Sequence, residues 1–457
     1  MDFFSETYHE SIKYAPKASP DPIVLYHENQ KPADRRYSAN SRIDVHCGEV
    51  PSYGYTSADD LRPVGIYVVL RNRSLPDGVY VFDSETLGKA PDIAGSLVKI
   101  GGKDEMKKIV SAFAENELVS ETPILYIFTG IFERAVWHFK EAAYSQVLKD
   151  VGACVGSILL HAKAKGGKTF SLGGFVDSDL SVTLKLSATE VPLAALAVFP
   201  EYSPTAYDSV DEGIGESAYS NRGELETTPN ETKFTSRFMC QNYVENIDDL
   251  SKCIRIRRLT SQPLPGDEFP LTLPKFTSEL YFNKITNLQF ERPSFAPFSR
   301  HSMDLDIFSS ILRWLELGQI NLFGAGLLKI WIICFDVMFV YPGVYRYVPV
   351  RKSIYMQSGL VNLKKFIKLH ATPSEAENAS FAILLTADLK EACNLLGERA
   401  YRYLQLNAGY LLQSTTLSSR ILNRKSRAIH FYFENEIKEL CSLPETESIL
   451  AEILVGK

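Results

Sequence analysis

The sequence has 457 residues, enough for two or three domains that each bury a core of their own. Its 45% hydrophobic and 23% charged residues are ordinary globular values, and its net charge of -6 argues against nonspecific nucleic-acid binding. No basic stretch followed by an apolar run opens the chain, so we expect no secretion signal. The seven cysteines are scattered without zinc-type pairs, which predicts buried free thiols and a cytoplasmic protein.

The first half of the chain begins with a polar arm and continues with strands and a helix. Residues up to about 41 are polar and punctuated by proline, and we expect an arm or a short helix laid on the body. Residues 66–70 and 79–82 are predicted strands that flank a turn at residues 75–78. Residues 103–115 have the apolar spacing of an amphipathic helix.

A stretch in the first half is repeated in the second half. Residues 122–186 match a stretch that starts near residue 380, at a constant offset of 257 positions (386 − 129) and without a gap. The offset aligns Thr129 with Thr386. Each copy predicts a strand, a turn, a long helix, a second strand and a short helix. We infer from this match that one ancestral unit is present twice.

The two long helices predict how the copies pack. They cover residues 142–164 and 399–417, and each is apolar over more than one face, which is more than a single sheet can cover. A large exposed apolar face is normally a partner surface, so we expect an intramolecular pseudo-dimer with these helices at its interface. Gly152 and Gly409, which the offset aligns, would allow close backbone approach there.

An acidic stretch separates the two copies. Residues 201–233 are rich in Ser, Pro, Gly and Thr and are the best candidate for a linker. Residues 320–341 are the most apolar window, but polar residues interrupt it, so we expect a buried strand rather than a membrane span. The predicted fold class is α+β, with a first unit at residues 1–200, a linker and connecting segment at 201–285, and a second unit at 286–457.

Several short motifs point together to one family. Residues 398–403 (ERAYRY) precede an Ala-Gly pair on the second long helix, and Gly173-Gly174-Phe175 ends a strand of the first copy. Residues 57–67 keep Ser57 and five further positions of a segment that reads PSAGALYPVEIYVV in the family. On these residues the chain resembles the nitroreductase superfamily, in particular the SagB-type thiazoline and oxazoline dehydrogenases. The resemblance implies two tandem nitroreductase-like units, FMN as the cofactor, and a role in ribosomal-peptide natural-product biosynthesis.

The resemblance also implies residues for the FMN phosphate and ring edge. Arg292 and Ser294 are kept from the family's RRSxRxF segment, and arginine suits a dianion because its hydrogen bonds are charge-assisted. The family's second arginine is Pro293 here. An ordinary helix-start segment is the alternative interpretation. Arg257–Arg258 is a rival anchor, and Arg35–Arg36 lies near the corresponding place in the first copy.

Gly173 and Gly174 are the candidate residues for close contact with the flavin. Glycine would let the backbone approach the ring system where a β-carbon would block it. The alternative is a simple strand-to-helix turn before Asp177, with Asp177 as the cap of the next helix. The second copy has His430 and Phe431 at the aligned positions. Ser57 is the further cofactor-binding residue that the resemblance implies.

His138 is the candidate catalytic residue. The family's lysine–tyrosine pair, which serves in proton transfer, falls on His138–Phe139 in the first copy and on Leu395–Leu396 in the second. A histidine suits a base because its reference pKa lies near neutrality. The alternative is a packed structural residue beside Trp137 and Phe139. No zinc, P-loop or Ser-His-Asp pattern is found, so no metal is predicted.

Two functions follow from these observations. The first is an FMN-dependent oxidoreductase that dehydrogenates a thiazoline, an oxazoline or a related group in a precursor peptide or small molecule. The second is a non-catalytic scaffold or partner subunit of a peptide-modifying complex, paired with a cyclodehydratase or an active homologous dehydrogenase. The departures at Pro293 and Leu395 motivate the second hypothesis. Neither hypothesis predicts a nucleic-acid or membrane partner.

Overall fold

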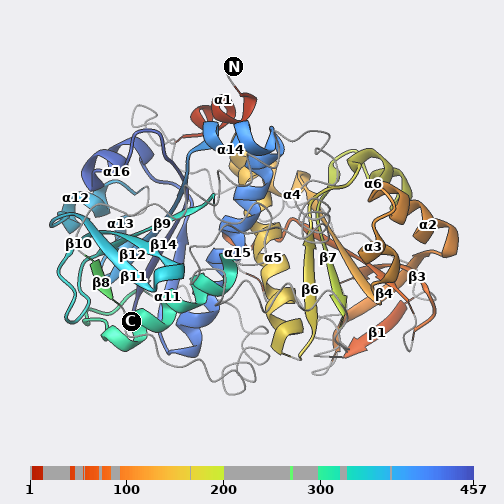
Figure 1. Ribbon diagram of the computed structural model, residues 1–457, viewed down its shortest axis with the longest axis horizontal. Helices are drawn as coiled ribbons and strands as arrows, with labels where there is room; N and C mark the ends of the chain where they lie inside the picture. Colours follow the sequence, from red (N-terminus) through yellow and green to blue (C-terminus); the bar gives the residue numbers. More distant parts are fainter. Residues whose placement is uncertain are drawn as a thin grey trace, which may run out of the picture.

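Two antiparallel sheets lie side by side in the computed structural model, the first to the right and the second to the left in Figure 1. The structure describes residues 3–13, 42–46, 55, 57–71, 75–83, 93–164, 166–199, 268–270, 297–319, 327–370 and 373–457. Each sheet has seven strands within this part of the chain. No helix in the described residues combines the length and apolar character that crossing a membrane requires.

The first sheet carries short helices on one face and the long helix α5 (Ala143–Ala164) on the other. In spatial order its strands are β1 (Arg42–His46), β4 (Ile93–Gly101), β3 (Gly78–Asp83), β2 (Val64–Leu70), β5 (Ile124–Ile131), β7 (Glu190–Phe199) and β6 (Lys168–Leu172). The outer face packs against α2 (Lys103–Ala112), α3 (Glu117–Glu121) and α6 (Asp177–Thr183). The inner face packs against α5 (Ala143–Ala164), which follows α4 (Glu133–Phe139). Two short 3-10 helices are η3 (Ala58–Asp60) and η4 (Lys140–Ala142).

The second sheet has the same strand order. Its strands are β8 (Glu268–Pro270), β11 (Ser353–Ser358), β10 (Gly343–Val348), β9 (Lys329–Cys334), β12 (Phe381–Ala387), β14 (Ser448–Gly456) and β13 (Lys425–Ile429). The accompanying helices are α11 (Leu305–Gln319), α12 (Leu363–Lys368), α13 (Pro373–Ala376), α14 (Leu389–Leu396), α15 (Arg399–Ile421), α16 (Glu434–Cys441) and the 3-10 turn η5 (Pro349–Arg351). β8 falls within the predicted connecting segment 201–285, yet it pairs with β11 as an edge strand.

Strands β7 and β14 were not expected from the sequence, although each lies inside its sheet. β7 lies between β5 and β6, and β14 lies between β12 and β13. The pairing register of β5 with β7 shifts between Phe128 and Thr129, and that of β12 with β14 shifts between Leu385 and Thr386. These two irregularities are 257 positions apart (386 − 129 = 257), so the two sheets correspond down to a local detail of register.

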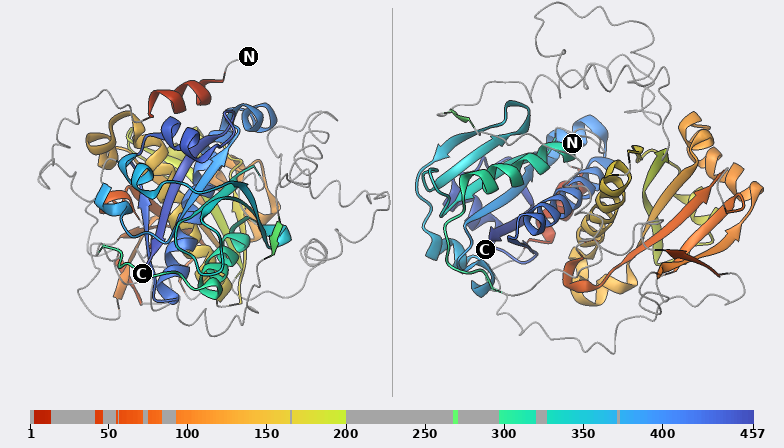
Figure 2. Two further views of the ribbon diagram at one scale, coloured as in Figure 1. Left: turned by 90° about the vertical axis from the view of Figure 1, so that its left-hand side faces the viewer. Right: turned by 90° about the horizontal axis from the view of Figure 1, so that it is seen from below.

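The helices α5 and α15 pack directly on each other between the two sheets (Figure 2). A β-carbon added to Gly152 would lie 2.0 Å from the carbonyl oxygen of Leu406, and one added to Gly409 would lie 1.9 Å from that of Lys149. The offset of 257 relates these two contacts, because it takes Gly152 to Gly409 and Lys149 to Leu406. Further along, Gln413 Nε2 donates to Ser157 Oγ at 2.8 Å.

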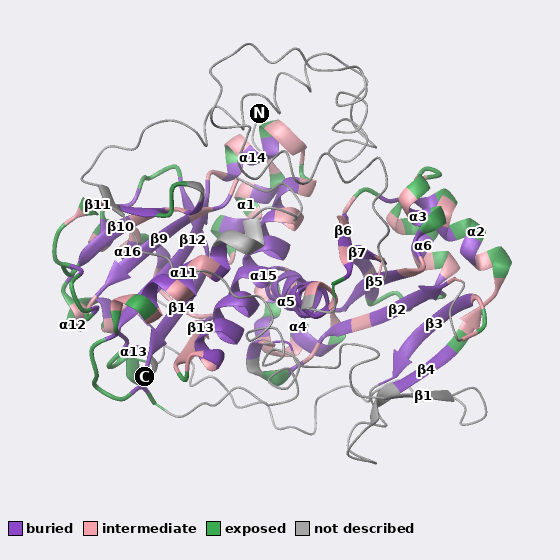
Figure 3. Ribbon diagram, turned by 60° about the horizontal axis from the view of Figure 1, so that its bottom comes forward, coloured by how far each residue is buried: buried purple, intermediate pink, exposed green. Residues whose placement is uncertain are grey.

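One hydrophobic core runs through both halves of the molecule. It combines the inner faces of both sheets with α5, α11, α14 and α15, and Figure 3 shows the buried residues continuing through the middle. A smaller core lies outside each sheet, beneath α2 and α6 in the first half and beneath α12 and α16 in the second. Because the central core is shared, the two halves are expected to lose their packing together.

The ends of two predicted helices differ from the structure. The helix predicted at residues 103–115 ends at Ala112, since Ala114 and Glu115 have positive φ angles of 54° and 53° that no α-helix continues through. The helix predicted at 399–417 continues to Ile421. The expectation of buried free thiols is confirmed for the cysteines in the described residues, which are Cys154, Cys334, Cys393 and Cys441.

A buried histidine–glutamate pair predicts how stability depends on pH. His370 Nε2 lies 2.7 Å from Glu452 Oε1, and both side chains are buried. Burial alone would lower the pKa of His370, but the charge of Glu452 and its hydrogen bond outweigh burial and raise that pKa. A raised folded-state pKa stabilises the protein fully below the unfolded value of about 6.5, and the contribution is lost as the pH rises through the folded value.

We therefore expect the urea midpoint to fall as the pH is raised above about 6.5, in a series of unfolding curves at constant ionic strength. His370→Gln should lower the midpoint at low pH and flatten this dependence. A wild-type midpoint that rises over the same interval would contradict the assignment of a charged, paired His370.

Candidate functional site

The Gly173-Gly174-Phe175 turn lies between β6 and α6 on the side of the first half that faces α15. Neither glycine has a positive φ, so the backbone conformation does not require glycine at these positions. Gly174 is exposed, whereas Phe175 is buried. Among the described residues, the amides of Gly174 and Phe175 have no hydrogen-bond acceptor, while the next amide, of Val176, donates to Ala112 O at 2.9 Å. The turn therefore presents two amide donors beside an exposed residue without a side chain.

The first turn of α15, from the second half of the chain, binds this glycine turn. Arg399 Nη1 donates to Gly173 O at 2.9 Å, and its Nη2 donates to Phe175 O at 3.0 Å. The Tyr403 hydroxyl also donates to Gly173 O, at 3.3 Å. The Arg399 guanidinium lies 5.6 Å from the centre of the Phe175 ring. Two carbonyl groups of the turn, those of Gly173 and Phe175, are thus bound by the other half of the molecule.

Asp177 joins the two halves through a pair of arginines. Its carboxylate accepts from Arg399 at 3.2 Å and from Arg402 at 2.9 and 3.2 Å. Burial would lower the pKa of Arg402, but the hydrogen bonds and charge of Asp177 outweigh burial and raise it. Asp177 is not the cap of α6: the N-cap is Val176, without a side-chain hydrogen bond. The two guanidinium groups and one carboxylate give this cluster a net charge of +1.

The equivalent position on the other side of the α5–α15 pair is built differently. The offset of 257 takes the glycine turn to His430-Phe431-Tyr432 and takes Tyr403 to Gln146. Gln146 Oε1 lies 3.2 Å from His430 Nδ1, and the rings of Phe139 and Phe431 stack with centroids 5.9 Å apart. Aromatic side chains therefore occupy the place where the first position has an exposed glycine.

His138 belongs to this second position rather than to the glycine turn. It is half-buried on α4. Its ring meets the rings of Trp137 and Phe139 edge-on, with centroid distances of 5.3 and 4.6 Å. The ring centroids of Phe139 and His430 are in turn 6.1 Å apart. The packing between Trp137 and Phe139 is the arrangement that the structural alternative for His138 predicts.

Ser57 binds helix α5 from the segment that precedes η3. Its hydroxyl donates to Asp150 Oδ2 at 2.6 Å and accepts from the amide of Arg62 at 2.9 Å. The amide of Ala58 donates to Asp150 Oδ1 at 3.1 Å. Ser57 therefore contacts the second turn of α5, whereas Gly173 contacts the first turn of α15. The predicted residues Arg292 and Ser294, and the rival pairs Arg257–Arg258 and Arg35–Arg36, lie outside the described residues.

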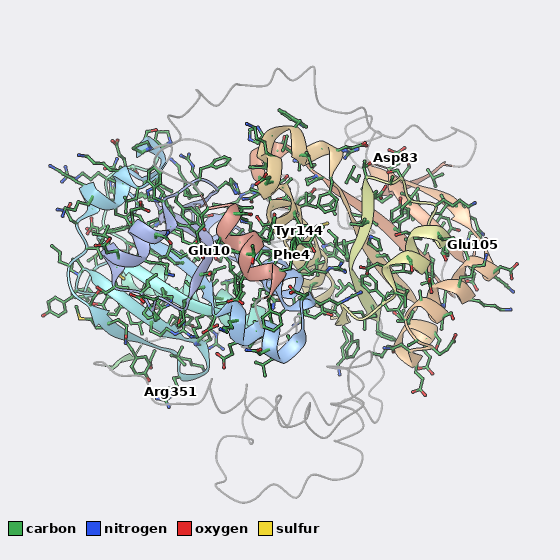
Figure 4. All side chains as sticks on the ribbon, turned by 90° about the horizontal axis from the view of Figure 1, so that it is seen from above. Phe4, Glu10, Asp83, Glu105, Tyr144 and Arg351 are labelled. Carbon is green, nitrogen blue, oxygen red and sulfur yellow. The ribbon has the colours of Figure 1, made fainter. Side chains whose placement is uncertain are left out.

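Helix α1 (Phe4–Ser11) lies across the top of the α5–α15 pair, where Figure 4 shows it crossing the middle of the molecule near Tyr144. The amides of Phe4 and Ser5 donate to the Glu398 carboxylate at 2.7 and 3.0 Å. Tyr8 donates to Glu141 O, 257 positions before Glu398, at 2.8 Å. The predicted N-terminal arm thus contacts both halves at related points.

Glu434, the equivalent of Asp177 (434 − 257 = 177), is held by α1 instead of by arginines. His9 Nε2 lies 3.2 Å from its carboxylate, and Lys13 Nζ lies 3.4 Å away. Burial would raise the pKa of Glu434, but these partners and the amide of Ile449 lower it. The two equivalent carboxylates therefore bind different partners.

Sequence reasoning found the glycine turn but missed Arg399 and Arg402 as its partners. The arginines lie 222 residues or more from their contacts, so local spacing gives no indication of the contact. The buried pairs Thr129–Glu190 (2.6 Å) and Thr386–Glu447 (2.5 Å) were also missed. The same offset relates these pairs (447 − 190 = 257), so extending the repeat a few residues further would have indicated them.

Comparison with known proteins defines the fold of the chain. No protein-family model matches it. A Methanocaldococcus jannaschii protein named as a nitroreductase is 25% identical over 135 residues, which cover 28% of this chain and 64% of that protein's length, just under two thirds. A solved structure from Anabaena variabilis, also named as a nitroreductase, matches with a TM-score of 0.77 at 18% identity over 100% of both chains. The chain has a mixed α/β nitroreductase-like fold.

Proposed function

We propose that the chain is an FMN-dependent oxidoreductase of the SagB type, which dehydrogenates a thiazoline, an oxazoline or a related group in a precursor peptide or small molecule. The observation that carries the proposal is the Gly173-Gly174-Phe175 turn. Its glycines are not required by backbone conformation, its amide donors have no acceptor among the described residues, and its carbonyls are held by Arg399. The nitroreductase-like fold over the whole chain and the names of the two relatives support the same class.

The residues of the turn fit a flavin. A planar heteroaromatic ring with acceptor atoms at its edge needs backbone donors and close approach, and the turn offers both. Bound FMN would supply the hydride-accepting chemistry, while the protein binds and orients. Arg292, Ser294 and Ser57 remain proposed contacts from the family resemblance. His138 remains the proposed base, although its ring lies in the cluster with His430.

We further propose that the two halves form a pseudo-dimer derived from one duplicated unit. Three observations support this: the common strand order, the register irregularities 257 positions apart, and the reciprocal glycine contacts of α5 and α15. Reciprocal contacts, in which one residue touches the counterpart of its own neighbour, are what a two-fold interface produces.

Gly174→Val tests the proposed cofactor site. A branched side chain on the exposed residue of the turn should obstruct close approach and raise the Kd for FMN by about a hundredfold or abolish binding. Ser178→Val, at an exposed position in the first turn of α6, is the matched control and should bind FMN like the wild type. Purified protein incubated with FMN and desalted gives the readout in its visible flavin spectrum. A colourless wild-type protein would refute the proposed function.

A second candidate function is a scaffold or partner subunit in a peptide-modifying complex. The specific observation in its favour is the second interface position, where Phe139 and Phe431 stack in place of an exposed glycine. Co-purification with a cyclodehydratase or an active dehydrogenase homologue, in the absence of bound flavin, would support this function over the first. Flavin that copurifies with the isolated chain would remove its main reason.

A further inference from the structure

We propose that Arg399 is the positioning residue of the glycine turn, so that the chain has one composite cofactor site rather than two. This inference rests on the proposed function for the identity of the ligand. It follows from a difference between the two equivalent interface positions: the second half supplies Arg399 to the turn of the first half, whereas the equivalent residue in the first half is Ala142 (399 − 257 = 142), which carries no donor.

Arg399 sets the direction of the amide donor of Gly174. In a trans peptide unit the carbonyl and the following N–H point in opposite directions, and no cis peptide occurs in the described residues. Because the carbonyl of Gly173 points at Arg399 Nη1, the N–H of Gly174 points away from Arg399. The second hydrogen bond, from Nη2 to the carbonyl of Phe175, fixes the other end of the turn in the same way.

Arg399 is itself held in place by its neighbours. Asp177 Oδ1 accepts from Arg399 Nη2 and from Arg402 Nη1, both at 3.2 Å, so the carboxylate ties the two guanidinium groups together. The ring of Phe175 lies under the Arg399 guanidinium. A planar guanidinium spreads its donors over separate nitrogens in a fixed fork, which suits two carbonyls and a carboxylate, whereas an ammonium group has its three donors on a single nitrogen.

The second position lacks this arrangement. Gln146 contacts the side chain of His430 rather than a carbonyl of the turn, and Phe139 packs on Phe431. Glu434, the counterpart of Asp177, is paired with His9 of α1 and with Lys13, which follows that helix. The aromatic side chains fill the surface that an approaching ring system would need, so the second position is closed to a cofactor.

The test is a titration of the full-length chain with FMN, in which fluorescence quenching measures binding. We expect one FMN per chain, and we expect Arg399→Gln to raise the Kd about tenfold or more, since the turn loses two charge-assisted hydrogen bonds. Arg399→Lys should recover only part of the affinity. In flavin-free protein, hydrogen–deuterium exchange over residues 170–177 should speed up in Arg399→Gln, a readout that does not depend on the ligand.

Gln146→Ala is the matched control, because it removes the cross-interface contact at the equivalent position of the second turn. It should leave the FMN affinity and the exchange of residues 170–177 at wild-type values. Two FMN per chain, or an Arg399→Gln protein with wild-type Kd and wild-type exchange, would overturn the inference while leaving the proposed function intact. Should Arg399→Gln fail to fold, Arg399→Lys decides by the same two measurements.

Discussion

Gly409→Leu is expected to lower the free energy of unfolding by more than about 4 kcal/mol or to prevent folding altogether. The β-carbon alone would lie 1.9 Å from the carbonyl oxygen of Lys149, which belongs to the backbone of α5. No rotamer change relieves a contact with helix backbone, so the two helices must move apart and open the core that both halves share. Gly152→Leu should have the same effect, since it meets Leu406 of α15. Urea unfolding followed by circular dichroism measures both.

Two further glycines give controls for this prediction. A β-carbon at Gly359 meets nothing within 4 Å, so Gly359→Ala should change the stability by no more than about 0.5 kcal/mol. The β-carbon of Gly156→Ala would lie 2.7 Å from the ring of Tyr410, a side chain that has some freedom to shift. The loss of stability should therefore lie between those of Gly359→Ala and Gly409→Leu. Wild-type stability of both Gly409→Leu and Gly152→Leu would show that α5 and α15 do not approach so closely.

Glu447→Ala is expected to lower the free energy of unfolding by about 3–5 kcal/mol, because it leaves buried partners unpaired. The carboxylate is 3% exposed and accepts from Lys329 at 2.6 Å, from the Trp331 indole at 2.9 Å and from Thr386 at 2.5 Å. Glu447→Gln keeps an acceptor but not the charge, and should lower the free energy of unfolding by less than Glu447→Ala does. Glu445→Ala, at an exposed position two residues earlier, is the control and should be within about 0.5 kcal/mol of the wild type.

Acid unfolding provides an independent check on Glu447. Burial would raise the pKa of Glu447, but Lys329 and the hydrogen bonds outweigh burial and lower it. A lowered folded-state pKa stabilises the protein above the unfolded value of about 4.3, and this contribution is lost as the pH falls through the folded value. The stability difference between wild type and Glu447→Ala should therefore shrink below about pH 4. A difference that grows on acidification would contradict the paired carboxylate.

The sequence predicts those elements of the fold that a turn signal marks or whose length is decisive. The turn between β2 and β3 marks that hairpin, and length marks the helices α5 and α15; the structure has all of them within a few residues. β7 and β14 are buried almost throughout, as β2 and β3 are, but each follows a helix rather than a hairpin turn, so no turn signal marks them. The positive φ angles at Ala114 and Glu115, which end α2 early, are not indicated by the residue types of that segment.

The candidate site was predictable only where one stretch of chain carries it. Gly173 and Gly174 stand out as adjacent glycines after a strand, and they need no partner to be noticed. In the alternative interpretation of the glycine turn, Asp177 is a helix cap, because a carboxylate near a helix start usually serves that purpose, whereas in the structure two arginines of the other half bind it. Contacts of this kind depend on how the halves pack, which local patterns do not encode.

The difference between Arg399 and Ala142 has a genetic consequence. In an assembly of two identical chains, one codon specifies the same residue at both interface positions, so no substitution can improve one position without altering the other. Here separate codons specify the two residues, and mutation can act on each alone. One position is thereby free to keep a guanidinium and an open glycine, while the other accumulates aromatic side chains that add packing at the interface. If the glycine turn is the cofactor site, as proposed, ligand binding and interface packing are assigned to separate positions, whereas two identical chains would have to combine them at each.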